Sequence, residues 1–286
     1  LIVLKARDLP SGWAGKLWAL SEGHRYLKQA GISCDYLWLS DADIDHSPET
    51  LGRLVAKAVC DKRELTSLMV LLRTGGFWGK LLIPPFVYFF QKLYPFNWSA
   101  DPGKRTAAAA GGCVLLKREA FESAGGFEAI HGALIDDCSL ARLIKRRGGG
   151  SGRIWLGLTK SSVSLRPYRG LEDIWNMVAR SAYTQLHSSS LLLVAALFGL
   201  GVTYLLPPGL LVLGLTLGDG PLAGGALLVW LTMALTMLPV LKLYDQSPIW
   251  GPLLPFAALL YGAMTISSAL RHWRGKGGAW KGRHRA

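Results

Sequence analysis

The chain has 286 residues, 50% of them hydrophobic, and its 32 Lys and Arg against 19 Asp and Glu give a formal net charge of +13. The apolar residues are concentrated in residues 189–217, 222–241 and 246–270, which contain no charged side chain. Uncharged stretches of about 20 residues match a hydrocarbon core of roughly 30 Å, so a wholly soluble protein is excluded. The cations form no recognition helix or RNA-binding motif, which argues against nucleic acid as a partner.

Residues 1–188 alternate strand-like and helix-like runs, which predicts an α/β domain followed by transmembrane helices over 189–270. The chain begins with an apolar, strand-like run over 1–4 and without an initiator Met, so we expect that an N-terminal part of the domain is missing. The next predicted elements are a helix over 13–30, a short strand over 36–39, a helix over 49–59, strands over 65–72 and 112–116, a helix over 117–123, a helix over 137–145, a strand over 153–156 and an amphipathic helix over 171–186.

Residues 86–98 hold seven aromatic side chains and a single charge, that of Lys92. Such a segment is typical either of the headgroup level of a membrane or of an aromatic-rich core helix. The uncharged stretches later in the chain favour the membrane interface. The helix over 171–186 then forms a surface-lying connection to the first span.

The tail over 271–286 carries six cations and no acid directly after an apolar segment, which marks the cytoplasmic side of a membrane. A cytoplasmic domain and a cytoplasmic tail require an even number of crossings. We therefore expect one uncharged block to be re-entrant or to split, and Pro207-Pro208 make 189–217 the candidate. The four cysteines show neither disulfide nor zinc spacing and fit a reducing compartment.

The first chemical motif is Asp41-Ala42-Asp43, directly after the apolar strand over 36–39. Two carboxylates at i and i+2 on a turn can share a Mg²⁺ or Mn²⁺ ion that also binds a diphosphate. The alternative is that Ser40 or Asp41 only caps a turn. The position after a strand favours the metal and donor site.

Asp136 and Asp137 begin the predicted helix over 137–145, where an aspartate is either a helix cap or a general base. The pair Gly111-Gly112 lets backbone approach a ligand closely or serves a packing need. Lys16, at the start of the helix over 13–30, can reach a phosphate or simply begin that helix.

In this order the motifs resemble those of the family 2 glycosyltransferases, which have a GT-A fold: a Gly-Lys helix start, a DxD motif, a Gly-Gly segment followed by Gly125-Gly126-Phe127, and an acidic pair. The chain is most similar to the hopene-associated, membrane-bound members of that family. The segments that carry this likeness are Ser67-Leu68-Met69-Val70, Leu93-Tyr94-Pro95-Phe96, Ile135-Asp136-Asp137-Cys138, Ser164-Leu165-Arg166 and Gly278-Ala279-Trp280-Lys281-Gly282-Arg283.

The resemblance implies that Asp41 and Asp43 bind the donor and a divalent metal ion, Asp43 being the stronger candidate ligand. It makes Asp137, beside Asp136, the catalytic base. Arg180 is what remains of a Gln-x-x-Arg-Trp motif and is a candidate contact for the diphosphate; the loss of Gln and Trp argues against a processive polysaccharide synthase. Lys16, Gly111 and Gly112 complete the expected donor-binding residues.

The sequence thus predicts an inverting glycosyltransferase of the bacterial inner membrane, with its GT-A domain in the cytoplasm. It uses Mg²⁺ or Mn²⁺ and moves a sugar from a nucleotide-sugar, a UDP-sugar by resemblance, to a lipid acceptor for which a hopanoid is one candidate. Two alternatives stay open: a polyprenyl-phosphate sugar transferase, and a non-catalytic membrane protein that binds nucleotide-sugar or lipid.

Overall fold

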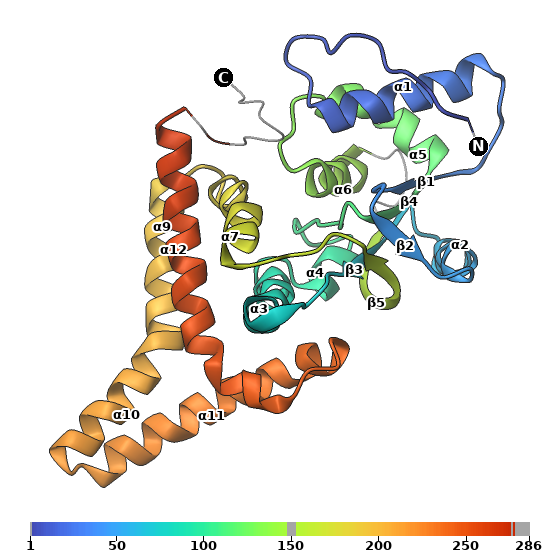
Figure 1. Cartoon of the computed structure of the whole chain (residues 1–286). Helices are drawn as coiled ribbons and strands as arrows, with labels where there is room; N and C mark the ends of the chain where they lie inside the picture. Colours follow the sequence, from blue (N-terminus) through green and yellow to red (C-terminus); the bar gives the residue numbers. More distant parts are fainter. Residues whose placement is uncertain (1, 148–152, 276, 278–286) are drawn as a thin grey trace. The chain divides into compact units, whose positions relative to one another are not determined.

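The computed structural model describes residues 2–147, 153–275 and 277 (Figure 1). It divides into two compact units, one built from Leu1–Leu72 and Gln91–Leu165 and the other from Arg73–Phe90 and Arg166–Ala286. This packing differs from the predicted blocks over 1–188 and 189–270, since the helices after residue 166 pack with the apolar helices. Much of the predicted basic tail, including the motif over 278–283, lies outside the described residues.

A mixed five-stranded sheet forms the centre of the first unit, in the order β1-β4-β3-β5-β2. The strands are β1 (Tyr36–Ser40), β2 (Ile44–His46), β3 (Leu65–Leu71), β4 (Cys113–Lys117) and β5 (Ile154–Ser164). β3 and β5 are parallel, whereas β4 runs antiparallel to both β1 and β3, and β2 runs antiparallel to β5. In the β1–β4 pair, Ser40 lies opposite Cys113, so the end of β1 meets the start of β4.

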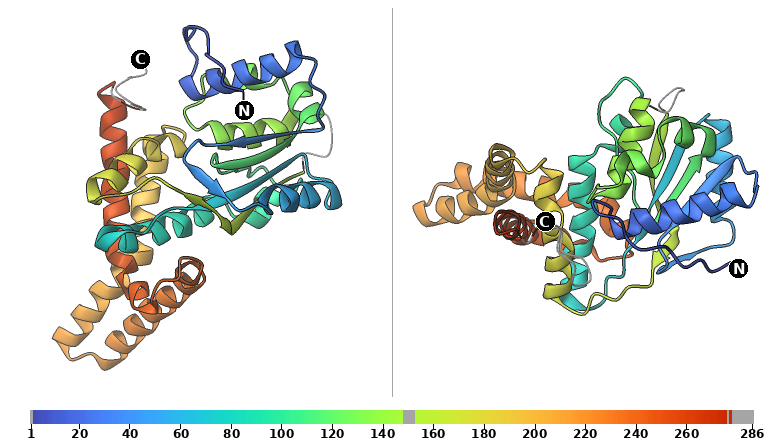
Figure 2. Two further views of the ribbon diagram at one scale, coloured as in Figure 1. Left: turned by 45° about the vertical axis from the view of Figure 1, so that its right-hand side comes forward. Right: turned by 90° about the horizontal axis from the view of Figure 1, so that it is seen from above.

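Helices cover both faces of this sheet (Figure 2). α1 (Gly15–Gln29), α5 (Arg118–Ser123) and α6 (Asp136–Arg147) contribute to one core, and α2 (Thr50–Cys60) contributes to the other. Within β4, Val114 and Leu116 face the first core, while Cys113 and Leu115 face the second. Burial on both faces explains why this strand reads as an unbroken apolar run, and the predicted α/β class is confirmed.

The structure differs from the predicted elements in three details. Residues 2–4 are not a strand, because no strand in the described part of the chain pairs with them and their side chains are exposed. β2 was not predicted, since a three-residue strand is too short to show a period. The predicted helix over 171–186 is two helices, α7 (Leu171–Ala179) and α8 (Ala182–Gln185).

The second unit contains three helical segments long and apolar enough to cross a membrane: Ser190–Leu217, Gly220–Leu243 and Pro248–Trp273. They comprise α9 (Ser190–Leu200), the π-helical turn η2 (Gly201–Leu205) and α10 (Leu206–Leu217), then α11 (Gly220–Leu243), then η3 (Pro248–Leu253) and α12 (Leu254–Trp273). α7 packs on α12, where Trp175 Nε1 donates to Ser267 Oγ at 3.2 Å. The predicted apolar helices are therefore confirmed.

The chain does not turn back at Pro207-Pro208, as the re-entrant alternative required. Both prolines lie at the start of α10, directly after the π-helical turn η2, and a helix can bend at such a turn without ending. Ser190–Leu217 thus continues as a single helical segment. The even number of crossings stays a prediction.

The aromatic segment over 86–98 falls into α3 (Gly76–Leu93) and α4 (Phe96–Ala100). Tyr88 of α3 is buried, and its hydroxyl hydrogen-bonds Thr236 of α11 at 2.8 Å. Trp98 of α4 is 55% exposed. The core alternative therefore holds for Tyr88, and the interfacial position of Trp98 stays a prediction.

Candidate active site

Three segments far apart in the sequence meet through one ammonium group. Lys16, in the first turn of α1, places Nζ 2.8 Å from Asp41 Oδ1 and 3.0 Å from Asp136 Oδ2. Asp41 follows the last residue of β1, and Asp136 begins α6 next to Asp137. We call Lys16, Asp41, Asp136 and Asp137 the Lys16 cluster. It joins the first residue of the DxD motif to the acidic pair.

Asp137 is a carboxylate of the cluster with a strongly raised pKa. Burial raises its pKa from 3.8 to about 6, and the neighbouring charge of Asp136 acts in the same direction. Its oxygens accept hydrogen bonds from Cys138 N–H at 2.7 Å and Gly111 N–H at 2.8 Å, which together with Lys16 limit the rise. A carboxylate with a pKa of about 6 is ionised at neutral pH and basic enough to accept a proton.

The surroundings of the cluster explain this loss of hydration. A small cavity is lined by Asp136, Asp137, Lys16 and Gly111 on its polar side. Its remaining walls are Leu17, Leu20, Leu39, Ser40, Val114, Phe127 and Leu140. An apolar wall behind a carboxylate removes water and so disfavours the charged form.

Gly111 is held in place by a serine inside β3. The fully buried Ser67 Oγ accepts from Ala110 N–H at 2.9 Å and lies 3.0 Å from the carbonyl oxygen of Cys113, to which it can donate. A Cβ atom at Gly111 would lie 3.0 Å from Lys16 Nζ, so any side chain there would crowd the cluster. A polar residue in a buried strand was the signal in the sequence for this role.

Gly112, the other expected donor contact, packs inside the domain. A Cβ atom there would lie 3.0 Å from Val70 Cγ2 and 3.4 Å from Ile44 Cδ1. The need for glycine at this position is thus explained by close packing, the alternative that the sequence left open.

The N-terminus of α1 offers a site for an anion beside Lys16. The helix has no side-chain cap and no acidic residue in its first turn, so its first N–H groups lack helical partners. Ala14 N–H donates to His131 O at 2.8 Å, which fixes the start of the helix. Burial lowers the pKa of Lys16, but the Asp136 and Asp41 carboxylates outweigh it and raise that pKa above its ordinary value. Lys16 is thus a permanent cation at a positive helix end.

Asp43, the expected metal ligand, has an exposed side chain on the turn between β1 and β2. Its backbone oxygen accepts from Leu165 N–H at 2.7 Å, which ties the turn to the end of β5. Within residues 2–147 and 153–275, no three His, Cys, Asp or Glu side chains gather closely enough to hold a metal ion. Mg²⁺ is commonly held by one or two carboxylates and substrate phosphates. Asp41 and Asp43 lie on one turn and both reach solvent, where donor phosphates could complete the ligands, and their role as metal ligands stays a prediction.

A histidine that the sequence analysis did not single out closes this turn. His46 Nε2 lies 2.8 Å from Ser40 Oγ, and His46 Nδ1 lies 2.9 Å from Ser162 Oγ on β5. The imidazole packs against Trp38, with ring centroids 4.8 Å apart. These contacts hold the two ends of the DxD turn together; the signal in the sequence was a histidine three residues after Asp43.

Arg180 is the one expected site residue outside the first unit. It follows α7 in the second unit, where its N–H donates to Asn176 O at 3.2 Å. Its contact with a diphosphate stays a prediction.

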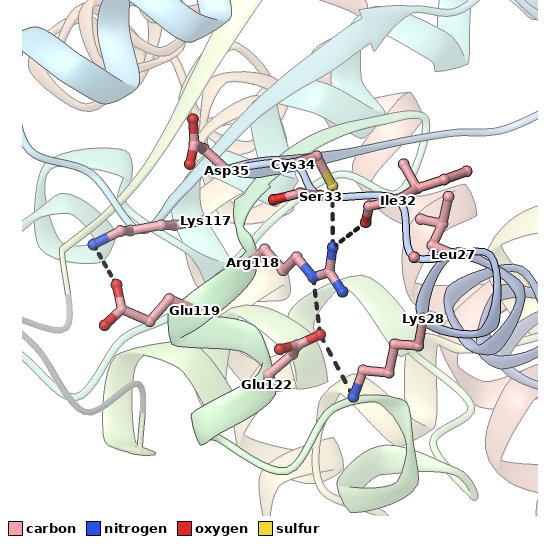
Figure 3. A pocket seen from close by; sticks show the side chains of 11 residues that line it. Leu27, Lys28, Ile32, Ser33, Cys34, Asp35, Lys117, Arg118, Glu119 and Glu122 are labelled. Atoms are coloured by element: carbon pink, nitrogen blue, oxygen red, sulfur yellow. Dashed lines mark hydrogen bonds and ion pairs between the residues drawn. The ribbon is translucent and has the colours of Figure 1, made fainter.

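A second cavity of the first unit lies at the opposite end of β1 (Figure 3). Its charged side chains neutralise one another: Arg118 Nε lies 3.0 Å and Lys28 Nζ 3.5 Å from Glu122, and Lys117 Nζ lies 2.9 Å from Glu119. Asp35, on its rim, precedes β1, whereas Asp41 follows it. The Lys16 cluster, with its perturbed carboxylate and uncapped helix, is therefore the better candidate for chemistry.

Comparison with known proteins identifies the family of the chain. The family model described as "Glycosyl transferase family 21" matches residues 26–283, most of the chain. No curated protein matches the sequence. The prediction of a glycosyltransferase is confirmed, but the matched family is not the family 2 that the motifs resemble. The chain therefore belongs to glycosyl transferase family 21, and it carries three segments apolar enough to cross a membrane.

Proposed function

We propose that this protein transfers a sugar, with inversion, from a nucleotide-sugar to a hydroxyl group of a lipid. The observation that carries the proposal is the Lys16 cluster. In this cluster Asp137, whose pKa is about 6, lies next to Asp136. Lys16 in turn forms ion pairs with Asp136 and with Asp41, the first residue of the DxD motif. A base and a diphosphate-binding region side by side are what direct displacement at an anomeric carbon needs.

The residues divide the chemistry between them. Asp137 accepts the proton of the acceptor hydroxyl as its oxygen attacks the anomeric carbon, and the bond to the nucleotide diphosphate breaks on the opposite side. Lys16 and the first N–H groups of α1 face the negative charge that develops on the leaving diphosphate. A divalent cation at Asp43 would neutralise part of that charge as a Lewis acid.

The raised pKa of Asp137 favours a hydroxyl acceptor over a polyprenyl phosphate. A phosphate acceptor is already anionic and needs no base, whereas a hydroxyl must lose its proton during attack. Burial that raises a carboxylate pKa toward neutrality improves a general base. The three apolar segments of the second unit support a lipid as acceptor, and a hopanoid is one candidate.

The test uses the full chain in membranes with radiolabelled UDP-sugars and mass spectrometry of any labelled lipid. We expect label in a lipid whose glycosidic bond resists mild acid, since sugar phosphates of polyprenols are acid-labile. Asp137→Asn should abolish transfer while leaving UDP binding intact. Asp35→Asn is the matched control, because Asp35 is exposed at the opposite end of β1. Full turnover in Asp137→Asn, or label confined to an acid-labile polyprenol, would refute the proposal.

A further inference from the structure

Lys16 is in direct contact with one of the two carboxylates expected to hold a metal ion. Its Nζ lies 2.8 Å from Asp41 Oδ1 and 3.0 Å from Asp136 Oδ2, so one ammonium bridges both. Both carboxylates retain some exposure, 38% for the Asp41 side chain and 24% for that of Asp136. The pair is therefore reachable by an ion from solvent, and Lys16 already supplies its counter-charge.

The charge balance of the site depends on that single lysine. Asp41, Asp43, Asp136 and Asp137 bring four carboxylates to adjoining turns, and Lys16 is the cation paired with them among the described residues. A metal ion approaching Asp41 meets the Lys16 ammonium at close range and is repelled by it. The Asp41 carboxylate, which is already paired with Lys16, therefore attracts the metal ion less than a free carboxylate would. A donor diphosphate changes this balance, because it brings new negative charge to Lys16 and to the N-terminus of α1.

We propose that Lys16 acts as a built-in counter-cation that keeps the acidic site from binding a divalent cation until the donor diphosphate is present. The diphosphate draws Lys16 toward itself and releases Asp41. The nucleotide diphosphate thus binds first, and tight binding of the metal ion follows. This inference rests on the proposed function, because it assigns an order of binding to the same site.

The experiment measures Mn²⁺ binding to the purified full chain in detergent, by the loss of the free-ion signal in electron paramagnetic resonance. For the wild type we expect Mn²⁺ to bind at least about tenfold more tightly with UDP than without it, a coupling of ordinary size. Lys16→Gln should bind Mn²⁺ without UDP at least about tenfold more tightly than the wild type. Lys16→Arg keeps the charge and should bind Mn²⁺ as the wild type does, both with and without UDP.

Two further variants make the test specific. Lys28 lies on the same helix as Lys16 but pairs with Glu122, so Lys28→Gln should leave Mn²⁺ binding unchanged. Adding Asp43→Asn to Lys16→Gln should abolish the gained binding, which shows that the ion occupies the acidic site. Equal Mn²⁺ affinity of the wild type with and without UDP would overturn the inference, as would unchanged affinity in folded Lys16→Gln. Neither result bears on whether sugar is transferred, which the lipid-labelling assay decides.

Discussion

Asp136→Asn is the change that most directly tests how the site sets its proton affinity. Asp137 has a pKa of about 6 where an ordinary aspartate has 3.8, a difference of about 3 kcal/mol between its two protonation states. Burial is the larger cause and the Asp136 charge the next. Removing that charge while keeping the side-chain shape should lower the pKa of Asp137 by about one unit.

The sign of the effect follows from the role of the base. Only ionised Asp137 accepts a proton, so kcat/KM of the wild type should fall as pH drops through about 6 and level off above it. With that pKa, about nine-tenths of the enzyme is inactive at pH 5 and about one-tenth at pH 7. Asp136→Asn should move this acid limb to lower pH. Lys16→Gln should move it to higher pH, because the Lys16 charge lowers the pKa of Asp137.

The assay is the initial rate of lipid labelling between pH 4.5 and pH 8 at subsaturating donor and saturating metal ion. Asp35→Asn serves as the control and should keep the wild-type profile. An acid limb near pH 4 in the wild type would contradict the burial of Asp137. A limb that does not move in Asp136→Asn would show that the neighbouring charge has no part in it.

Two further predictions concern residues that support the site, and a third concerns Glu22 of α1, which forms an ion pair with Arg7. Gly111→Ala should lower kcat while leaving thermal unfolding unchanged, because its Cβ displaces the flexible end of Lys16; an equal loss of stability would contradict this. Ser67→Ala should cost about 1–3 kcal/mol in urea unfolding, since it leaves Ala110 N–H without its buried acceptor, and a neutral result would refute the support assigned to this serine. Glu22→Gln should lower the melting temperature at pH 7, because hydrogen bonds from Arg7 lower the pKa of Glu22 to about 2. That stabilisation is present above pH 4.5 and lost as pH falls toward 2, so the difference from wild type should vanish there.

Much of the architecture could be predicted from residue patterns. The apolar strands before Asp41 and around Cys113 appear where expected, because strands buried on both faces leave a continuous apolar signal. The uncharged segments of the second unit are helical for an equally local reason, their length and hydropathy. The helix boundary at 179–182 was missed, since periodicity continues across a two-residue break.

The candidate site shows where sequence reasoning stops. The sequence indicated Asp41, Asp137 and Lys16 as candidates, but each could equally have had a structural role, as a turn cap, a helix cap or the start of a helix. The ion pairs of Lys16 with Asp41 and Asp136 depend on the antiparallel pairing of β1 with β4 and on where α1 and α6 begin, which bring positions about 120 residues apart within 3 Å. No local pattern encodes such a distance.

The sequence by itself determined which residue types were available: carboxylates after a strand, a lysine at a helix start and three segments suited to a bilayer. The tertiary structure decided what they do to one another. It partly buried Asp137 against an apolar wall and placed Lys16 between Asp136 and Asp41. Charge interactions and desolvation depend on distance and burial, and those exist only once the chain has folded.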